Sequence, residues 1–219
     1  MTESTGKRWT HPVRRLALLC AGLVIMAFGV AFSIKAALGT SPISSVPYVT
    51  ARISGLSVGT TTIIMNFLFV LIQIAILRRQ YEWFQLLQFP AAVLFGVMID
   101  VAEAVLAPLP AGNYAQQWLL CAAGIFFIAL GVSVEVIANL VTTAGEGIVL
   151  AICKVVPVKF GNMKMAFDIT LVCISIVLSL LFLGQLDGVR EGTVAAALLV
   201  GQITKRFQPL MKTLERAVL

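Results

Sequence analysis

The strongest constraint on this sequence is a series of long apolar segments with few charges, each close to the length that crosses a lipid bilayer. About 20 apolar residues in a helix span the roughly 30 Å hydrocarbon core. Such segments lie at Leu16–Leu38, Gly59–Leu77, Phe84–Leu106, Trp118–Leu140, Met165–Leu183 and Thr193–Ile203, the last being the weakest. Because a span in lipid must satisfy its own backbone hydrogen bonds, they predict an all-α membrane protein with six transmembrane helices.

Two interruptions separate these segments at corresponding places. Gly39–Val58 lies between the first and second spans, and Val141–Phe160 lies between the fourth and fifth. Each contains an apolar run that is too short to cross the bilayer, Ile43–Ile53 in the first and a similar run ending at Val156 in the second. We expect a short re-entrant or interfacial helix at each place.

Basic residues set the expected orientation. Of 219 residues only 12% are charged, and the formal net charge is +6. With a cytoplasmic N-terminus, six crossings leave only Lys35, Arg52 and Arg190 toward the outside. Thirteen of sixteen basic residues then face inward, which satisfies the positive-inside rule: Lys7, Arg8, Arg14, Arg15, Arg78, Arg79, Lys154, Lys159, Lys164, Lys205, Arg206, Lys212 and Arg216. We expect a multi-pass protein of the bacterial cytoplasmic (inner) membrane with both termini cytoplasmic, in contact with lipid and not with nucleic acid.

One membrane domain accounts for the whole length, residues 1–219. The basic N-terminal residues resemble the start of a signal peptide, but the apolar run continues to Ile34, so we expect a retained first helix. The predicted parts are a cytoplasmic N-terminus (1–15), a first three-helix repeat (16–107), a second, inverted repeat (118–206) and a cytoplasmic tail (207–219).

The repeat rests on a shift of 102 residues, which brings the two halves into register without a gap. Gly22, Gly29 and Thr40 then fall on Gly124, Gly131 and Thr142, while Ser41 meets Thr143 and Asn66 meets Asp168. Three crossings are an odd number, so the second copy enters the membrane in the opposite orientation. Inverted repeats with interrupted segments are typical of secondary transporters, and their sites lie near the midplane beside the interruptions.

Candidate site residues are polar groups in the interruptions or inside the spans, where polar groups are costly. They are Thr40, Ser41, Ser44, Thr142, Thr143 and Glu146 in the interruptions, and Lys35, Asn66, Asp100, Glu135 and Asp168 in the spans. For several of them the alternative is a structural role. Lys35 can reach the membrane interface, Asp168 can pair with Lys164 one turn earlier, and Glu146 can serve as an acid at a helix N-terminus.

Catalytic signatures are absent from the sequence. His11 is the single histidine, and no phosphate loop, HExxH pattern or Ser–His–Asp set occurs. Cys20, Cys121, Cys153 and Cys173 lie in or beside apolar segments at no metal-ligand spacing, which indicates buried free thiols. We expect neither an enzyme, nor a metal site, nor a cofactor.

Three sequence elements resemble those of a known family. Gly-Val-Ala-Phe at 29–32 and Ala-Ala-Leu-Gly-Thr-Ser-Pro at 36–42 end the first span, and Gly-Leu-Ser-Val-Gly-Thr at 55–60 opens the second. This pattern is similar to the YczE/YitT-type bacterial integral membrane proteins, over roughly residues 15–206. The resemblance implies an architecture but no substrate, and the short YczE-like form without a soluble C-terminal domain fits better.

The leading functional hypothesis is a small secondary transporter or exporter of an unknown small solute. Its polar site would lie between the repeats, with Asp168, Glu146 or Glu135 coupling protons or binding a cation. A non-transporting scaffold or an accessory, substrate-binding subunit of a larger complex is the alternative, and a channel is a weaker third. Gly22 and Gly29 indicate close helix packing within a chain or between the chains of a homodimer.

Overall fold

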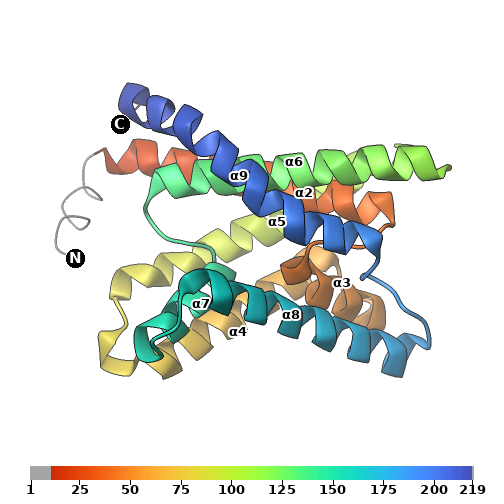
Figure 1. Ribbon diagram of the computed structural model, residues 1–219, viewed down its shortest axis with the longest axis horizontal. Coiled ribbons are helices and arrows are strands. Elements are labelled where there is room, and N and C mark those ends of the chain that lie inside the picture. Colours follow the sequence, from red (N-terminus) through yellow and green to blue (C-terminus); the bar gives the residue numbers. More distant parts are fainter. Residues whose placement is uncertain (1–10, 219) are drawn as a thin grey trace.

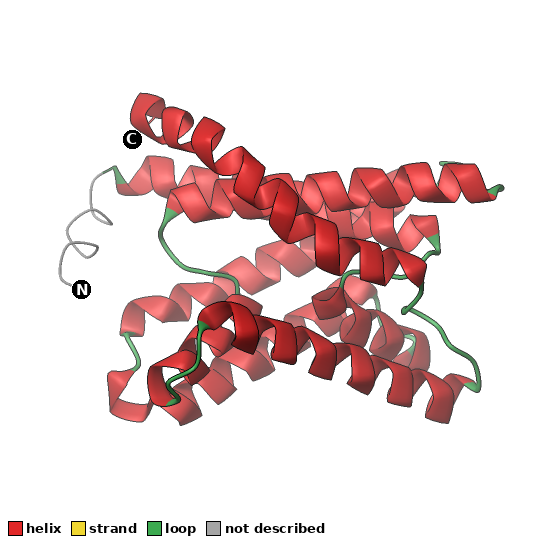
Figure 2. Cartoon of the chain, viewed as in Figure 1, coloured by secondary structure: helices red, strands yellow, loops and turns green. Residues whose placement is uncertain are grey.

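Residues 11–218 are described by a computed structural model, and they form eight α-helices and no strand (Figure 2). The helices are α2 Pro12–Ala36, α3 Pro42–Ser54, α4 Val58–Leu77, α5 Gln88–Leu106, α6 Tyr114–Ala138, α7 Ala144–Val155, α8 Phe160–Leu178 and α9 Glu191–Val218. Two 3₁₀ turns, η1 (Arg78–Gln80) and η2 (Trp83–Leu87), join α4 to α5, and a π turn, η3 (Ser179–Leu183), extends α8. The all-α fold class is confirmed.

Five helices are long and apolar enough to cross a membrane: α2, α4 with η1, η2 with α5, α6, and α8 with η3. The predicted sixth segment, 193–203, lies within α9, which continues as one helix past Lys205 and Arg206 and is not among the five. Its charges and lower hydropathy explain the difference. The sixth crossing therefore stays a prediction. The predicted basic residues Lys7 and Arg8, and the side chains of Lys212 and Arg216, lie outside the described residues.

Each predicted interruption ends a long helix and is followed by a short one. Helix α2 stops where Ala37 adopts left-handed dihedrals (φ 54°) and Gly39 follows with φ 92°, before Pro42 opens α3. Proline has no N–H and clashes with a preceding helical turn, so α2 cannot run on into α3. Helix α6 stops in the same way at left-handed Asn139, and Thr143 precedes the first residue of α7.

Helix boundaries repeat at the spacing found in the sequence. Helices α6, α7 and α8 begin 102 residues after α2, α3 and α4, respectively, and α6 ends 102 residues after α2. Helix α9 begins 103 residues after α5. The order of a long helix, a short helix and two further helices therefore occurs twice in the described chain.

Close contact between α2 and α6 joins the two halves (Figure 1). A Cβ atom on Gly22 would lie 3.0 Å from the carbonyl oxygen of Gly131, and one on Gly29 would lie 3.0 Å from that of Gly124. In the 102-residue register Gly22 corresponds to Gly124 and Gly29 to Gly131, so each glycine meets the counterpart of the other. These glycines serve packing within the chain.

The short helices pack on the opposite half of the molecule. Helix α3 lies against α8, and α7 lies against α4. At the first turns of the two short helices, Ile43 packs directly against Gly145, its own counterpart in the repeat. The first turns of the two short helices thus contact each other.

Helices α8 and α9 correspond to α4 and α5 in the repeat, but over their described residues they are not in close contact with each other, and α9 packs on α6. Helices α4 and α5 are in close contact where Gly59 faces Gly96. Nothing lies within 4 Å of a Cβ placed on Gly161 or Gly201, the glycines at the matching positions of α8 and α9. On α8 itself only Leu171 and Ser175 are buried.

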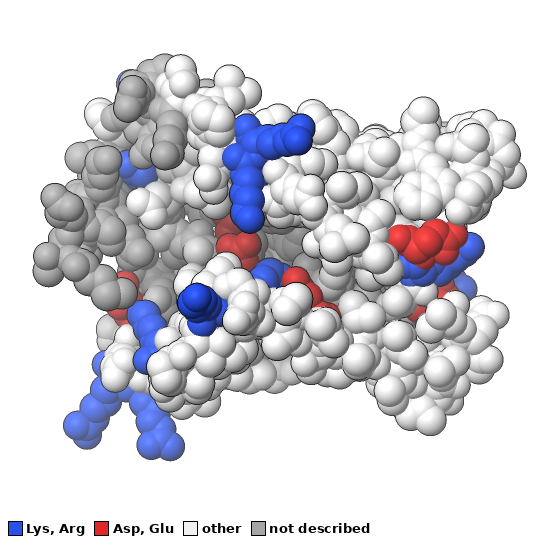
Figure 3. All heavy atoms as spheres, in the orientation of Figure 1, with Lys and Arg blue, Asp and Glu red and all other residues white. Residues whose placement is uncertain are grey.

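The start of α2, the last turns of α9 and the α4–α5 connection lie at one end of the molecule (Figure 1). That end, called the basic end below, carries Arg78 and Arg79 in η1, and Lys154 and Lys159 flank the α7–α8 connection there. Figure 3 shows Lys and Arg atoms reaching outward at this end, whereas at the other end they lie beside acidic atoms. The other end, where α2 gives way to α3, is called the opposite end.

Candidate functional site

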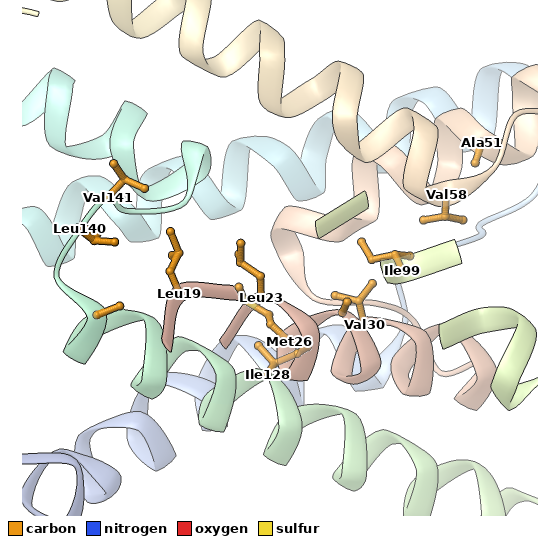
Figure 4. Packing of buried hydrophobic residues seen from close by; sticks show 12 residues of the cluster. Leu19, Leu23, Met26, Val30, Ala51, Val58, Ile99, Ile128, Leu140 and Val141 are labelled. Carbon is orange, nitrogen blue, oxygen red and sulfur yellow. The ribbon is translucent and has the colours of Figure 1, made fainter. Parts of the chain in front are cut away.

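An inner cavity of about 70 Å³ lies between α2, α3, α4 and α5 and reaches the interruption before α7. Helix α2 contributes four residues to its apolar wall, and α3, α4, α5, α6 and the second interruption contribute the rest. Figure 4 shows Leu19, Leu23 and Met26 in a row along this helix, with Ile128 of α6 beside Met26. The polar lining residues are Ser41, Ser44, Thr62, Asn66, Gln88, Glu135, Thr142 and Thr143. The cavity therefore combines an apolar body with a polar rim contributed by both interruptions.

A larger cleft of about 560 Å³ occupies the basic end, between the end of α4, η2, the end of α6 and α7. Its charged lining residues are Glu82, Glu135, Glu146 and Lys154. Four residues line both the cleft and the inner cavity, namely Gln88, Glu135, Val141 and Thr142. The two spaces are therefore neighbours, separated by a thin wall of side chains.

A pair of buried glutamines forms part of that wall. The Gln73 side-chain amide donates to the Gln88 carbonyl oxygen (3.1 Å) and to the backbone carbonyl of Ala144 (3.0 Å). Gly147 makes room for the pair, since a Cβ there would lie 2.6 Å from the Gln73 oxygen. The hydrogen bonds of these side-chain amides thus join α4, α5 and the first turn of α7 between the cavity and the cleft.

Glu135 stands at the junction of the two spaces. Its side chain is 4% exposed, and one carboxylate oxygen accepts the backbone N–H of Thr143 at 2.6 Å, at the start of α7. Glu146 lies one turn further along α7 and interacts electrostatically with Glu135 on one side and with Lys164 and Asp168 on the other. Glu135 near the end of α6 and Glu146 in the second interruption therefore place two acids at or beside the junction of cleft and cavity.

At the opposite end the first interruption is closed by the segment that leads into α9. The backbone N–H of Thr40 donates to the carbonyl of Gly188 (3.0 Å), and that of Gly192 donates to Leu38 (2.8 Å). The Arg190 guanidinium adds a bond to the Ala37 carbonyl (2.9 Å). The segment that leads into α9 thus covers the first interruption. The hydrogen bonds that hold it there are called the seal below.

The second interruption has different surroundings. Asn139, Val141 and Thr142 line the cleft, and so do Glu82 and Gln85 of the segment that leads into α5. By position in the repeat, that segment is the counterpart of the one that forms the seal. The first interruption is therefore covered by the segment that leads into α9. The second interruption instead borders the cleft, together with the segment that leads into α5.

Comparison with known proteins identifies the family. A model described as a family of unknown function, DUF6198, matches residues 13–209. The chain belongs to the DUF6198 family. The DUF6198 chain is also similar to the uncharacterized membrane protein YczE of Bacillus subtilis (strain 168), with 29% identity over 212 residues that cover 95% of this chain and 89% of the relative. The expected YczE-type membrane protein is confirmed. No solved structure shows significant similarity.

Six of the predicted site residues line the inner cavity of the DUF6198 chain: Ser41, Ser44, Asn66, Glu135, Thr142 and Thr143. Glu146 lines the cleft, and Thr40 is buried in the seal. Among the described residues no three His, Cys, Asp or Glu side chains are grouped as metal ligands.

The remaining three predicted residues line neither space. Lys35 donates to the carbonyl of Ala107 (2.7 Å). The Asp168 carboxylate pairs with Lys164 within α8. Asp100 accepts hydrogen bonds from Ser57 (2.7 Å) and from the N–H of Gly59 (2.7 Å), at the start of α4. Each of these charges is satisfied locally.

Asp100 is expected to stabilise the start of α4 in this DUF6198 chain. Removal of a side chain that caps a helix costs about 1–2 kcal/mol. Asp100→Ala should therefore lower the midpoint of thermal unfolding of the purified protein by a few degrees. Glu103→Ala, one turn later on α5, removes a carboxylate that caps no helix. Glu103→Ala should therefore lower the midpoint of thermal unfolding less than Asp100→Ala does. Equal shifts of the midpoint in the two variants would contradict the capping role of Asp100.

From the sequence, Gln73 and Gln88 could either line a cavity or bond between helices, and neither Thr62 nor Arg190 was predicted as a site residue. The two glutamines carried a signal, because a polar amide inside an apolar span needs a partner. Arg190 and the backbone of residues 187–192 gave no such sequence signal, since backbone hydrogen bonds depend on how the segments dock.

Proposed function

We propose that this protein is a small secondary carrier with one solute site between two inverted repeats, in the bacterial cytoplasmic membrane. The excess of Lys and Arg at the basic end supports placing that end in the cytoplasm, according to the positive-inside rule. The cleft then opens toward the cytoplasm and the seal lies on the outer side.

The proposed inverted repeat is supported by packing as well as by sequence. The glycine pairs Gly22–Gly131 and Gly29–Gly124 relate α2 to α6 by exchange of the two halves. The contact of Ile43 with Gly145 joins two counterparts directly. Contacts of this kind are expected when a twofold axis passes through the interface. With α9 as a sixth crossing, the halves have opposite orientations.

The observation that carries the proposal is the unequal state of the two interruptions. The first is held by two backbone hydrogen bonds in the seal, whereas the second borders a cleft of about 560 Å³. Two similar halves in different conformations are what an alternating-access carrier presents in one of its end states. In the other end state, the segment before α5 would cover the second interruption and the seal would be released.

Paired cysteines test the change between the two end states, in a chain whose four native cysteines are replaced by serine or alanine. Leu38→Cys with Gly192→Cys reports the seal, since a Cβ on Gly192 would lie 3.1 Å from that of Leu38. The same Cβ would lie 2.7 Å from the Leu38 carbonyl oxygen, so the segment must shift by a few tenths of an ångström to admit it. Gln85→Cys with Thr142→Cys joins two elements that line the cleft, and it reports the other end state. Each disulfide is expected to form in its own two-cysteine variant.

The four-cysteine chain provides the decisive comparison. We expect mass spectrometry to find one disulfide or the other in each molecule, and never both. Both bonds in one molecule would contradict alternating access. Failure of the disulfide between positions 85 and 142 to form at all would indicate a static protein, the result expected of an accessory or scaffold subunit.

A further inference from the structure

We propose that the solute is a small organic cation, with an apolar body and one amine, and that the Glu135 carboxylate binds the ammonium group. The assignment rests on the carrier function proposed above. It names the chemical class of solute for the same inner cavity and cleft.

Burial of Glu135 is the first observation. The side chain is 4% exposed and lines both the cavity and the cleft, and one of its oxygens accepts the N–H of Thr143. A buried carboxylate carries a large desolvation cost unless a positive group or several donors compensate it. A bound ammonium would supply that compensation with a charge-assisted hydrogen bond.

A purely structural role for Glu135 as a helix cap is not required by the fold. Ser33 occupies its place in the first half, where it bonds the carbonyl of Gly29 in its own helix. Helix α3 nevertheless begins at the matching position, after Ser41, without a carboxylate. A short helix can therefore start at this break without an acid, so capping alone does not account for Glu135.

The charge of the surroundings favours a cation. Glu135 is the one ionisable side chain among the described residues that line the inner cavity. The cleft adds Glu82 and Glu146 against a single base, Lys154. A cleft lined mainly by one sign of charge concentrates ions of the other sign. Beside Glu135, where none of the described basic side chains lines the inner cavity, an anionic solute would meet repulsion.

The apolar wall of the cavity favours an organic cation over a metal ion. Leu23, Met26 and Phe95 face the same space as Glu135. Hard metal ions prefer a shell of six or more oxygen ligands. An apolar wall with one carboxylate suits a hydrocarbon body that ends in an ammonium group. The cleft, at about 560 Å³, has the size of sites for small molecules.

Binding of three matched probes tests the proposal on the full chain in lipid nanodiscs. Phenethylamine carries the ammonium, 2-phenylethanol is its neutral counterpart, and 3-phenylpropanoate carries a negative charge. By calorimetric titration we expect the amine to bind about tenfold or more tightly than the alcohol, and the carboxylate not to bind. Equal affinity for amine and alcohol, or preference for the carboxylate, would overturn the proposal without any variant.

Substitution then assigns the charge to one residue. Glu135→Gln should weaken amine binding about tenfold or more and leave the alcohol unchanged. Glu103→Gln, which lines neither space, should bind the amine as the wild type does. Unchanged amine binding by a folded Glu135→Gln protein would exclude Glu135 as the ammonium ligand.

The outcomes separate the solute class from the carrier function. Mutually exclusive disulfides together with no amine selectivity would refute the organic cation and leave the carrier in place. Selective amine binding by a chain whose disulfides do not exchange would support the site and refute the carrier.

Discussion

Substitution of Gly29 by valine is expected to prevent the two halves from assembling. A Cβ at this position would lie 2.6 Å from the backbone nitrogen of Ile128 and 3.0 Å from the carbonyl oxygen of Gly124. Backbone atoms cannot rotate away as a side chain would, so α2 and α6 must separate. Overpacking of a tight interface costs about 1–3 kcal/mol, and a rigid backbone clash costs more.

The measurement is the yield of monodisperse protein after size-exclusion chromatography, followed by thermal unfolding. We expect little or no folded Gly29→Val protein. Gly201→Val is the matched control, since nothing lies within 4 Å of its Cβ and the glycine is also in a helix. A stable Gly29→Val protein would show that α2 and α6 need not approach so closely.

Gly39→Val is the second substitution with a large expected effect, because it acts on the seal. Gly39 has φ 92°, and a Cβ there would lie 2.5 Å from the backbone nitrogen of Arg190. The left-handed conformation costs about 1–2 kcal/mol for a residue with a side chain. Loss of the seal removes further hydrogen bonds, each worth about 0.5–1.5 kcal/mol.

The disulfide of the variant with Leu38→Cys and Gly192→Cys provides the readout for the seal. Its yield should fall steeply when Gly39→Val is added. Gly55→Val is the control for backbone strain alone, since Gly55 also has a left-handed φ (74°) but nothing lies within 4 Å of its Cβ. It should leave that disulfide yield unchanged. An equal loss in both variants would mean that strain, and not contact with the segment before α9, controls the seal.

Much of the fold could be predicted from the sequence because its signals are local. Gly39 and Pro42 follow a long apolar run and together favour a helix end there, and apolar runs of about 20 residues define spans without knowledge of their neighbours. The weakest predicted segment, 193–203, became part of a longer helix, since Lys205 and Arg206 are compatible with a helix although they are unfavourable in lipid.

The unequal state of the two interruptions could not be predicted in this way. Thr40 and Thr142 are identical residues at matching positions, yet one bonds Gly188 and the other lines the cleft. The difference arises from docking between distant segments. A sequence in which both halves carry similar residues does not specify which of the two interruptions is covered.

Candidate site residues also differ in ways that the sequence does not indicate. Asn66 and Glu135 were identified as polar groups inside spans, and both line the cavity. Lys35 and Asp100 have the same sequence signal, but their partners are the Ala107 carbonyl and the start of α4. Polarity in a span indicates that a partner exists, and the fold decides whether that partner is the protein itself.

The separation of α8 from α9 has a consequence for the surrounding membrane. Gly161 and Gly201 leave room that no described side chain occupies, and α8 buries only two of its residues. In a bilayer, the exposed face of α8 would meet acyl chains where the matching face of α4 meets α5. The lipid is then a structural component of the second half, and chain length and unsaturation become determinants of its rigidity.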